Sequence, residues 1–288
     1  MSSLRMQRAV MLSIGIFILV AVALVLLARL FFDSLYMSRL DRVNIAVWGP
    51  QSYVMSLSRV GKQHYMIMMS NAYTVQVPGG LAGYSIGSLG KLATLEKDPR
   101  LYMKAMGVGA GVFIHKYLYD SEPTIYYDDV WLEDSKFAEI KNHILKSTWL
   151  AGNMNIFDRL WMYATIRSTK PAQMTIYKVR DNPPDVLLYD KLFRDEQKLV
   201  QLGYVASEST ASFLARILEN TGIRVADISR ADSTMRKDSC TIVDSQESFS
   251  QTALFLAGHF GCVLEYGDTS LYDIYWVLDE KIEREWSM

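Results

Sequence analysis

The chain has 288 residues, half of them hydrophobic, and a formal net charge of −1. This share of apolar residues is enough for a folded core and argues against a disordered chain. A net charge this close to zero, without a basic stripe, excludes a typical nucleic-acid-binding protein. The length leaves room for one or two domains.

An uncharged segment of twenty residues runs from Ala9 to Ala28. At about 1.5 Å of rise per residue, a helix of this length spans about 30 Å, the thickness of a bilayer's hydrocarbon core. The segment is too long for the apolar part of a typical signal peptide, and it has no clear A-x-A cleavage site. The sequence therefore predicts a single transmembrane anchor over residues 9–32, in preference to a cleaved signal peptide or a buried helix.

The cations that flank this segment are nearly balanced under the positive-inside rule, with Arg5 and Arg8 before it and Arg29, Arg39 and Arg42 after it. The short tail, residues 1–8, contains no domain to translocate. We therefore expect a cytoplasmic N-terminus, with the bulk of the chain outside the cytoplasm.

The two cysteines, Cys240 and Cys262, fit an oxidising or a reducing compartment equally well. Each falls in a segment with the pattern of a strand. A disulfide between them is allowed, but this placement favours two buried thiols.

Residues 43–180 mix short apolar strands with helical stripes, which is typical of an α/β domain. Arg59-Val60-Gly61-Lys62 predicts a hairpin turn, and Gly107-Val108-Gly109 predicts the end of a helix. The expected strands are 44–48, 52–58, 63–69, 72–77, 111–118 and 174–179. The expected helices are 85–96, 99–106, 134–146 and 156–167.

Asp181-Asn182-Pro183-Pro184-Asp185 combines two prolines with turn-forming residues and predicts a domain boundary. We assign 181–197 to a linker and 198–288 to a second, small α/β domain that is expected to fold alone. Its expected strands are 198–202, 224–228, 240–243, 262–266 and 272–278. Its expected helices, 210–220 and 249–260, end at Gly222 and Gly261.

Gly83-Tyr84-Ser85-Ile86-Gly87 matches G-x-S-x-G, the nucleophile elbow of serine hydrolases. The elbow requires a strand directly before the serine, whereas residues 78–82 predict a loop. We interpret the match as a glycine-rich loop that leads into a helix. Gly90-Lys91 does not complete a phosphate-binding loop, because Leu92 stands where a serine or threonine is needed.

Asp128, Asp129, Glu133 and Asp134 form an acidic cluster. The cluster lacks the spacing of an EF-hand, so we interpret it as a solvated surface and not as a cation site. The four histidines are scattered, and two cysteines alone cannot form a structural zinc site. We assign no catalytic residue, no metal site and no cofactor.

In the first domain, Asn44 to Gly49 is similar to the motif N-I-L-L-x-G, and Thr74 to Gly79 is similar to T-Y-V-x-I-P-G. With these motifs the domain resembles the LytR-CpsA-Psr (LCP) family of cell-envelope proteins. The second domain resembles the LytR C-terminal domain. Its matching segments are Gly222-Ile223-Arg224-Val225, Ala231-Asp232-Ser233, Ser239 to Val243, Leu256 to Gly261 and Asp273 to Leu278.

The resemblance implies an anchored, extracytoplasmic domain that transfers glycopolymers from a polyprenyl-pyrophosphate carrier to the cell wall. In the family, arginines hold the pyrophosphate, and aspartates with magnesium assist. Three segments of this chain replace those motifs: Pro50-Gln51-Ser52-Tyr53, Ser70-Asn71-Ala72 and Glu133-Asp134-Ser135-Lys136. Neutral side chains cannot neutralise a pyrophosphate.

We therefore expect a non-catalytic, LCP-like envelope protein that binds a polyprenyl lipid, a wall glycopolymer or a protein. Apolar side chains of the hairpin suggest a hydrocarbon-binding groove: Met55, Leu57, Met66 and Met68. One alternative is an active, magnesium-assisted transferase with a relocated cationic site, for example at Arg159 or Arg167. Another alternative is an unrelated anchored interaction protein.

Overall fold

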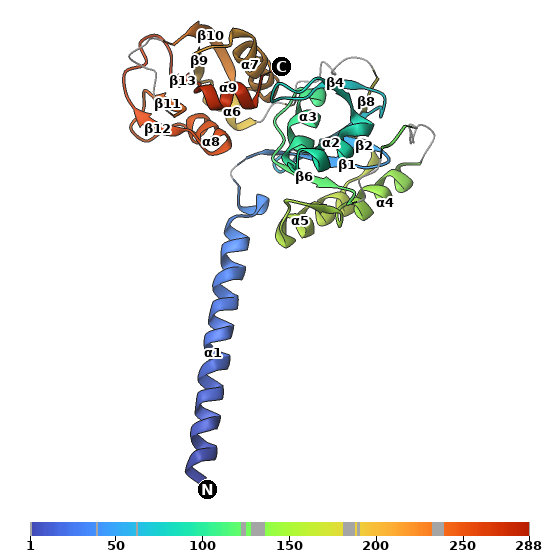
Figure 1. The fold of residues 1–288 in the computed structure, drawn as a ribbon, viewed down its shortest axis with the longest axis vertical. Helices are drawn as coiled ribbons and strands as arrows, with labels where there is room; N and C mark the ends of the chain where they lie inside the picture. The colour runs from blue at the N-terminus through green and yellow to red at the C-terminus, as the bar shows by residue number, and fades with distance from the viewer. Residues whose placement is uncertain are drawn as a thin grey trace.

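A computed structural model describes residues 2–38, 40–61, 63–121, 125–127, 136–180, 188, 191–231 and 239–287. The chain consists of a long N-terminal helix and two lobes (Figure 1). Each lobe contains a mixed sheet with helices packed against it, which confirms the predicted α/β class.

The N-terminal helix α1 (Ser2–Phe32) contains the apolar window Ile14–Phe32, with a mean hydropathy of 2.8. None of this window is buried against the rest of the chain. A helix that is apolar on all sides and uncovered fits lipid surroundings better than water. By length and composition, α1 is able to cross a membrane or to act as a signal sequence.

The first lobe has a six-stranded sheet with the order β7-β6-β1-β2-β3-β8. The predicted turn at 59–62, of which 59–61 are among the described residues, falls between the antiparallel strands β2 and β3, while β6 and β8 run parallel to their neighbours β1 and β3. The strands of this sheet are β1 (Arg42–Trp48), β2 (Ser52–Ser58), β3 (His64–Met69), β6 (Lys116–Tyr119), β7 (Ala151–Gly152) and β8 (Met174–Val179). A small hairpin, β4 (Thr74–Gln76) with β5 (Gly83–Ser85), lies outside it.

Both faces of this sheet are covered by helices. Side chains alternate along the strands, so that Trp48 and Val54 face α2 and α3, whereas Tyr53 and Met55 face α4 and α5. The covering helices are α2 (Leu89–Leu95), α3 (Arg100–Ala110), α4 (Phe137–Ser147) and α5 (Ile156–Ser168). The four residues suggested for a hydrocarbon groove (Met55, Leu57, Met66 and Met68) are at most 1% exposed. They form core beneath α4 and α5 and leave no groove open.

Helix α3 continues through the glycines that were expected to end it. The helix stops at Gly111, which has a φ of 69°. A Cβ at Gly107 would lie 2.9 Å from the carbonyl oxygen of Val112, and one at Gly109 would lie 3.0 Å from Val75. These glycines therefore allow close packing of α3. The strand expected at 111–118 is correspondingly shorter, because it begins only at Lys116.

The second lobe has a five-stranded sheet with the order β10-β9-β13-β11-β12, and its helices enclose one apolar core. The two helices with predicted glycine ends stop at Gly222 and Gly261, both with positive φ, as expected. The strands are β9 (Leu199–Tyr204), β10 (Arg224–Arg230), β11 (Thr241–Asp244), β12 (Val263–Tyr266) and β13 (Ile274–Val277). The helices are α6 (Lys191–Glu196), α7 (Glu208–Thr221), α8 (Gln251–Phe260) and α9 (Glu280–Glu285).

Helix α6 lies within residues 181–197, which the sequence assigns to a linker. Phe193 is buried in the core of the second lobe. The Glu196 carboxylate accepts hydrogen bonds from the backbone N–H groups of Gln251 and Thr252, at 2.6 and 2.9 Å. This carboxylate occupies the positive end of α8, so α6 is joined to the second lobe by both packing and hydrogen bonds.

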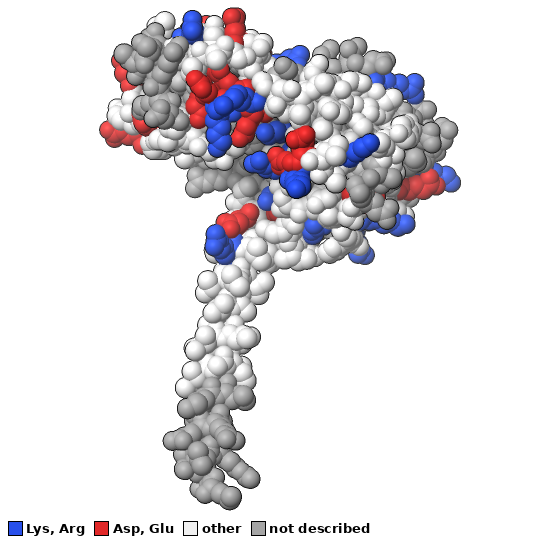
Figure 2. All heavy atoms as spheres, in the orientation of Figure 1, with Lys and Arg blue, Asp and Glu red and all other residues white. Residues whose placement is uncertain are grey.

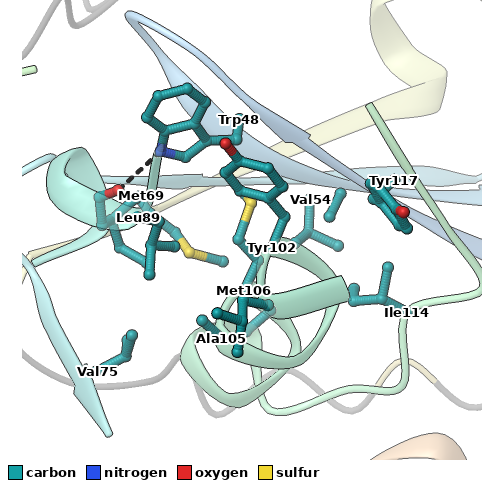
Figure 3. Close-up of a cluster of buried hydrophobic side chains, with 14 of the residues drawn as sticks. Trp48, Val54, Met69, Val75, Leu89, Tyr102, Ala105, Met106, Ile114 and Tyr117 are labelled. Atoms are coloured by element: carbon teal, nitrogen blue, oxygen red, sulfur yellow. Dashed lines mark hydrogen bonds between the residues drawn. The ribbon is translucent and has the colours of Figure 1, made fainter. Parts of the chain in front are cut away.

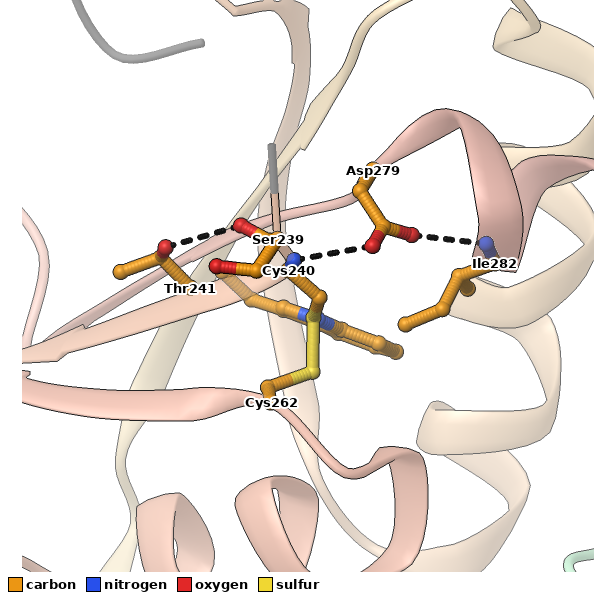
Figure 4. The surroundings of a disulfide bond; sticks show 7 residues. Ser239, Cys240, Thr241, Cys262, Asp279 and Ile282 are labelled. Atoms are coloured by element: carbon orange, nitrogen blue, oxygen red, sulfur yellow. Dashed lines mark hydrogen bonds between the residues drawn. A yellow bond between two sulfur atoms is a disulfide. The ribbon is translucent and has the colours of Figure 1, made fainter. Parts of the chain in front are cut away.

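Cys240 and Cys262 form a disulfide, so the prediction of two separate thiols is wrong (Figure 4). The strands β11 and β12 are parallel neighbours in which Thr241 lies opposite Val263. The residues that precede these partners are therefore also opposite each other, with Cα atoms 4.7 Å apart. This separation is within the range that a disulfide bridges.

Candidate functional site

A cleft lies between the two lobes, bordered by α3 of the first lobe and α9 of the second. Its larger cavity, of about 570 Å³, is lined by Arg100 and Lys104 from α3 and by Lys281 and Glu285 from α9. A second cavity of about 350 Å³ shares Arg100, Lys104 and Glu285 with the first and adds Arg284. The two cavities therefore adjoin each other at these shared residues. Figure 2 shows charged side chains gathered where the lobes meet.

The cations of the cleft differ in whether they are paired. Arg100 makes two hydrogen bonds to Asp98, at 2.9 and 3.1 Å, and these bonds hold the pKa of Asp98 below its usual value. Lys104 is 3.5 Å from Glu285. Neither Lys281 nor Arg284 has an acidic partner among the described residues. These two side chains are available to an anionic ligand.

The wall of the cleft in the second lobe is rigid and partly aromatic. Asp279 accepts the N–H groups of Cys240 and Ile282, at 3.0 and 2.7 Å, and so joins the disulfide to the start of α9 (Figure 4). Phe260 and Trp286 line the same cavity with ring centroids 6.0 Å apart. Phosphate oxygens suit the cations, and a sugar ring or lipid chain suits the aromatic surface.

The end of the described chain closes one side of the cleft. The carbonyl oxygen of Ser287 accepts the N–H groups of Gly79 and Gly80, at 3.0 and 3.2 Å. Both glycines have positive φ, which lets the turn at 78–80 present its two N–H groups together. Val108 and Phe113 of the first lobe are also buried in the core of the second. The lobes are thus held together on both sides of the cleft.

Two half-buried histidines lie at the lobe boundary, His115 before β6 and His259 in α8. Both contact the ring of Phe255. Burial lowers the pKa of His115 to about 3, with a further contribution from His259, and burial lowers the pKa of His259 to about 4.

These pKa values predict that acid destabilises the protein. The unfolded chain binds a proton at each histidine near pH 6.5, whereas the folded chain does not. The free energy of unfolding should therefore fall as the pH drops from about 6.5 to about 4. Denaturant titrations at pH 7.5 and 5 measure this change, and His259→Gln should show a smaller difference. An equal difference in the variant would contradict the role of His259.

Two of the three segments that replace the family's ionic motifs, residues 50–53 and 70–72, lie next to each other in the structure. Their polar side chains are neutral and buried. Gln51 and Asn71 are 3% and 2% exposed at neighbouring strand ends. The Asn71 amide donates to the carbonyl oxygen of Pro50 at 3.0 Å, and the carbonyl oxygen of Asn71 accepts the N–H of Gly87 at 2.9 Å. The side chains of Gln51 and Asn71 are themselves neutral, and both donate hydrogen bonds to backbone carbonyl groups. The third segment, 133–136, lies outside the described residues except for Lys136.

The space between the sheet and α2–α3 is filled by aromatic side chains near Gln51 and Asn71. Trp48 is fully buried, donates to the carbonyl oxygen of Ile86 at 2.8 Å and packs on Tyr102 (Figure 3). A Cβ at Gly90 would overlap the Trp48 ring, so the helix lies directly on it. This part of the first lobe is a packed core.

The arginines suggested for a relocated site lie on the opposite side of the sheet, on α5. The Arg159 guanidinium donates to the carbonyl oxygens of Thr148, Leu150 and Met154, at 2.6, 2.7 and 3.2 Å. It therefore fixes the loop before α5. Arg167 is exposed near the end of the same helix. The structure does not bring these two side chains together.

Two further motifs of the sequence are the G-x-S-x-G match and the acidic cluster. Ser85 ends the short strand β5, and its hydroxyl group bonds to Ser88 at 3.0 Å, with no histidine partner among the described residues. The acidic cluster at Asp128, Asp129, Glu133 and Asp134 lies outside the described residues. Within the described part of the chain, no group of three or more metal-binding side chains is present.

Sequence reasoning missed the cleft because its two halves come from different lobes. One local signal was available. Asp279, which directly follows the last expected strand, is a residue type that is preferred at the N-cap of a helix. Glu280 and Glu283, in the first turn after it, are also typical of a helix start. Recognising α9 would have placed Lys281 and Arg284 on one element.

No family model matches the sequence, and no curated protein matches it. The chain is similar to solved structures at low identity. TagV of B. subtilis is 11% identical, over 48% of this chain and 84% of that one, with a TM-score of 0.33. The transcriptional regulator yvhJ from Bacillus subtilis is 10% identical, over 48% and 82%, with a TM-score of 0.34.

A third neighbour is the LytR-CPS2A-psr family protein YwtF (TagT) with bound octaprenyl pyrophosphate lipid. It is 11% identical over 49% of this chain and 77% of that one, with a TM-score of 0.33. These neighbours are LytR-CPS2A-psr proteins. They belong to the family whose motifs the sequence resembles. At these TM-scores the likeness carries no conclusion about function.

Proposed function

We propose that the chain is a single-pass, extracytoplasmic envelope protein whose interlobe cleft binds a phosphate-bearing polymer or lipid carrier without transferring it. The observation that carries this proposal is the pair Lys281 and Arg284, which lack acidic partners among the described residues and face Arg100 and Lys104 across the cleft. Arg100 and Lys104 are already paired with Asp98 and Glu285, so Lys281 and Arg284 are the cations that suit the phosphate groups of a ligand.

The location outside the cytoplasm is supported by the disulfide. Structural disulfides persist in oxidising compartments and are rare in the cytoplasm. A spanning helix with the short tail 1–8 inside the cell places both lobes on the oxidising side. If α1 instead acts as a signal sequence, the lobes are still exported.

Protease added to cells stripped of their wall should therefore digest both lobes. A thiol-reactive reagent should label the protein only after reduction, because Cys240 and Cys262 are paired. The control is a cytoplasmic protein, which must stay intact in the same sample. Full protection of the lobes with an intact membrane would contradict this orientation.

The absence of transfer is supported by the neutral cluster around Gln51 and Asn71. A charge-assisted hydrogen bond contributes roughly 1.5–3 kcal/mol, and removing one donor to a developing charge commonly lowers the rate about 10²–10³-fold. Arg159 already has a structural role, because its guanidinium donates to three backbone carbonyl groups and so fixes the loop before α5. Binding therefore fits this chain better than catalysis.

The cleft proposal predicts that Lys281→Ala/Arg284→Ala weakens ligand binding about tenfold or more, since a tenfold change corresponds to about 1.4 kcal/mol. Binding of the full-length protein is measured separately to polyprenyl phosphate in micelles and to a poly(glycerol phosphate) fragment. These two arms distinguish a lipid carrier from a polymer. The matched control is Lys91→Ala/Arg230→Ala, which removes two exposed cations elsewhere.

Three results would contradict the proposal. Binding in neither arm, or equal loss in the variant and its control, would exclude the cleft. The same protein is incubated with polyprenyl-pyrophosphate-linked sugar, magnesium and peptidoglycan fragments. Turnover well above background that is lost in Arg167→Ala would show an active, relocated site.

A further inference from the structure

We infer that the face of the first lobe formed by α5, the end of α4 and the loop between them lies on an anionic bilayer surface beside the anchor. This inference rests on the proposed insertion of α1. Figure 1 shows α4 and α5 along the edge of the first lobe on the side from which α1 extends. We call this surface the α4–α5 face, with Trp149, Ile156, Leu160 and Tyr163 as its apolar residues.

The N-terminus of α5 is attached to the last turn of the apolar helix. The Asn155 side chain donates to the carbonyl oxygen of Leu30 at 2.9 Å. The rings of Phe31 and Phe157 contact each other edge to face, with centroids 5.4 Å apart. Leu30 and Phe31 belong to the window Ile14–Phe32. If that window spans the bilayer, the first turn of α5 lies at the depth of the membrane interface.

The outer side of α5 presents apolar side chains to the surroundings. Ile156 and Leu160, one turn apart, are 43% and 50% exposed, and Tyr163 and Ala164 continue the stripe. Trp149, in the preceding loop, is 55% exposed. Large apolar side chains in one helical row are costly in water and are stabilised at a membrane interface, where tryptophan and tyrosine are enriched.

The charged residues around this stripe are mostly cationic. Residues 136–170 contain six lysines and arginines against two acidic residues. One of those acids, Asp158, is fully buried, so it adds no negative charge to the surface. Lys146, Arg167 and Lys170 are exposed. An apolar stripe bordered by cations is the pattern of a helix that lies in the plane of an anionic membrane.

A bilayer explains this surface better than a protein partner because the face continues directly from α1. Phe32 and Tyr36, at the end of the anchor, are 67% and 50% exposed. The Phe31 ring contacts the rings of both Tyr36 and Phe157, with centroids 5.8 and 5.4 Å apart, so the aromatic end of the anchor adjoins the first turn of α5. The anchored lobe then contacts the membrane at two places and is restrained in its tilt.

The test uses the full-length protein in lipid nanodiscs with one introduced, fluorescently labelled cysteine. The native cysteines are paired, so only the introduced thiol is labelled. Leu160→Cys reports on the α4–α5 face. Leu24→Cys reports on the anchor, and Leu271→Cys reports on an 86% exposed site in the second lobe. A quencher carried by the lipid should dim the labels at 24 and 160 and leave the label at 271 unchanged.

Lipid composition and charge provide the second measurement. Quenching at position 160 should be stronger in nanodiscs with anionic lipid than in zwitterionic ones. Lys146→Glu/Arg167→Glu should remove that difference while the label at position 24 remains quenched. Lys91→Glu/Arg230→Glu, with the same charge change at exposed sites elsewhere, should leave the difference intact.

The outcomes separate the two proposals. If the label at position 24 is not quenched, the insertion of α1 fails and the inference fails with it. If the label at position 24 is quenched and the label at position 160, like that at 271, is not, α1 is inserted but the α4–α5 face does not lie on the bilayer, and the inference is overturned. A label at 160 that is shielded from water without lipid quenching would indicate a protein partner, which also overturns the inference.

Discussion

Replacing Asp158 with alanine should lower the free energy of unfolding of the first lobe by roughly 3–5 kcal/mol, the usual cost of breaking a buried charge pair. The Asp158 side chain is fully buried. One oxygen accepts the N–H of Leu35 at 2.6 Å, and the other accepts the N–H of Asn155 at 3.1 Å and lies 3.5 Å from the Lys116 ammonium. Alanine would leave all three donors unpaired.

Asp158→Asn is the matched variant. It keeps the shape and one acceptor oxygen but loses the charge, so it should cost less than alanine while still weakening the pair with Lys116. Thermal unfolding of the full-length protein in nanodiscs measures both. An unchanged melting temperature in Asp158→Ala would show that the contacts of this carboxylate do not stabilise the first lobe.

Loss of the Cys240–Cys262 disulfide should destabilise the second lobe by about 3 kcal/mol, because the bond closes a loop of 22 residues in the unfolded chain. The Trp276 indole N–H donates to the sulfur of Cys240 at 3.2 Å, so breaking the disulfide would also disturb this buried hydrogen bond. Denaturant titrations with and without a reducing agent measure this effect.

The control for reduction is Cys240→Ser/Cys262→Ser. This variant should be destabilised under oxidising conditions and should not respond further to the reducing agent. An oxidised wild type that unfolds at the same denaturant concentration as the double variant would show that the disulfide adds no stability. Cleft binding should weaken together with stability, since Asp279 joins Cys240 to α9.

Local patterns predicted most of the elements. The short apolar segments on both sides of the expected turn at 59–62 gave the two hairpin strands and the strand before them, because these strands are buried on both faces. The stripes of α7 and α8, with Gly222 and Gly261 after them, gave those helices and their ends. These features depend on neighbours in the sequence.

Features that depend on distant contacts were not predicted. Gly107 and Gly109 allow close approach to Val112 and Val75, and nothing in their local sequence separates that role from a helix end. The pairing of the two cysteines followed only from the adjacency of β11 and β12. The cleft likewise exists because α3 packs beside α9, so its cations could not be recognised as one set.

The strand order of the second lobe has a consequence for how the lobe is made. The strand β13 is the last in the chain, yet it lies in the middle of the sheet, parallel to β9 and antiparallel to β11. While the chain is being synthesised and exported, β9 and β11 have no central partner until residues 274–277 emerge. Cys240 and Cys262 both emerge earlier, so an oxidase can pair them before the sheet closes. Release of a prematurely terminated chain would expose two unpaired strand edges, which favour aggregation.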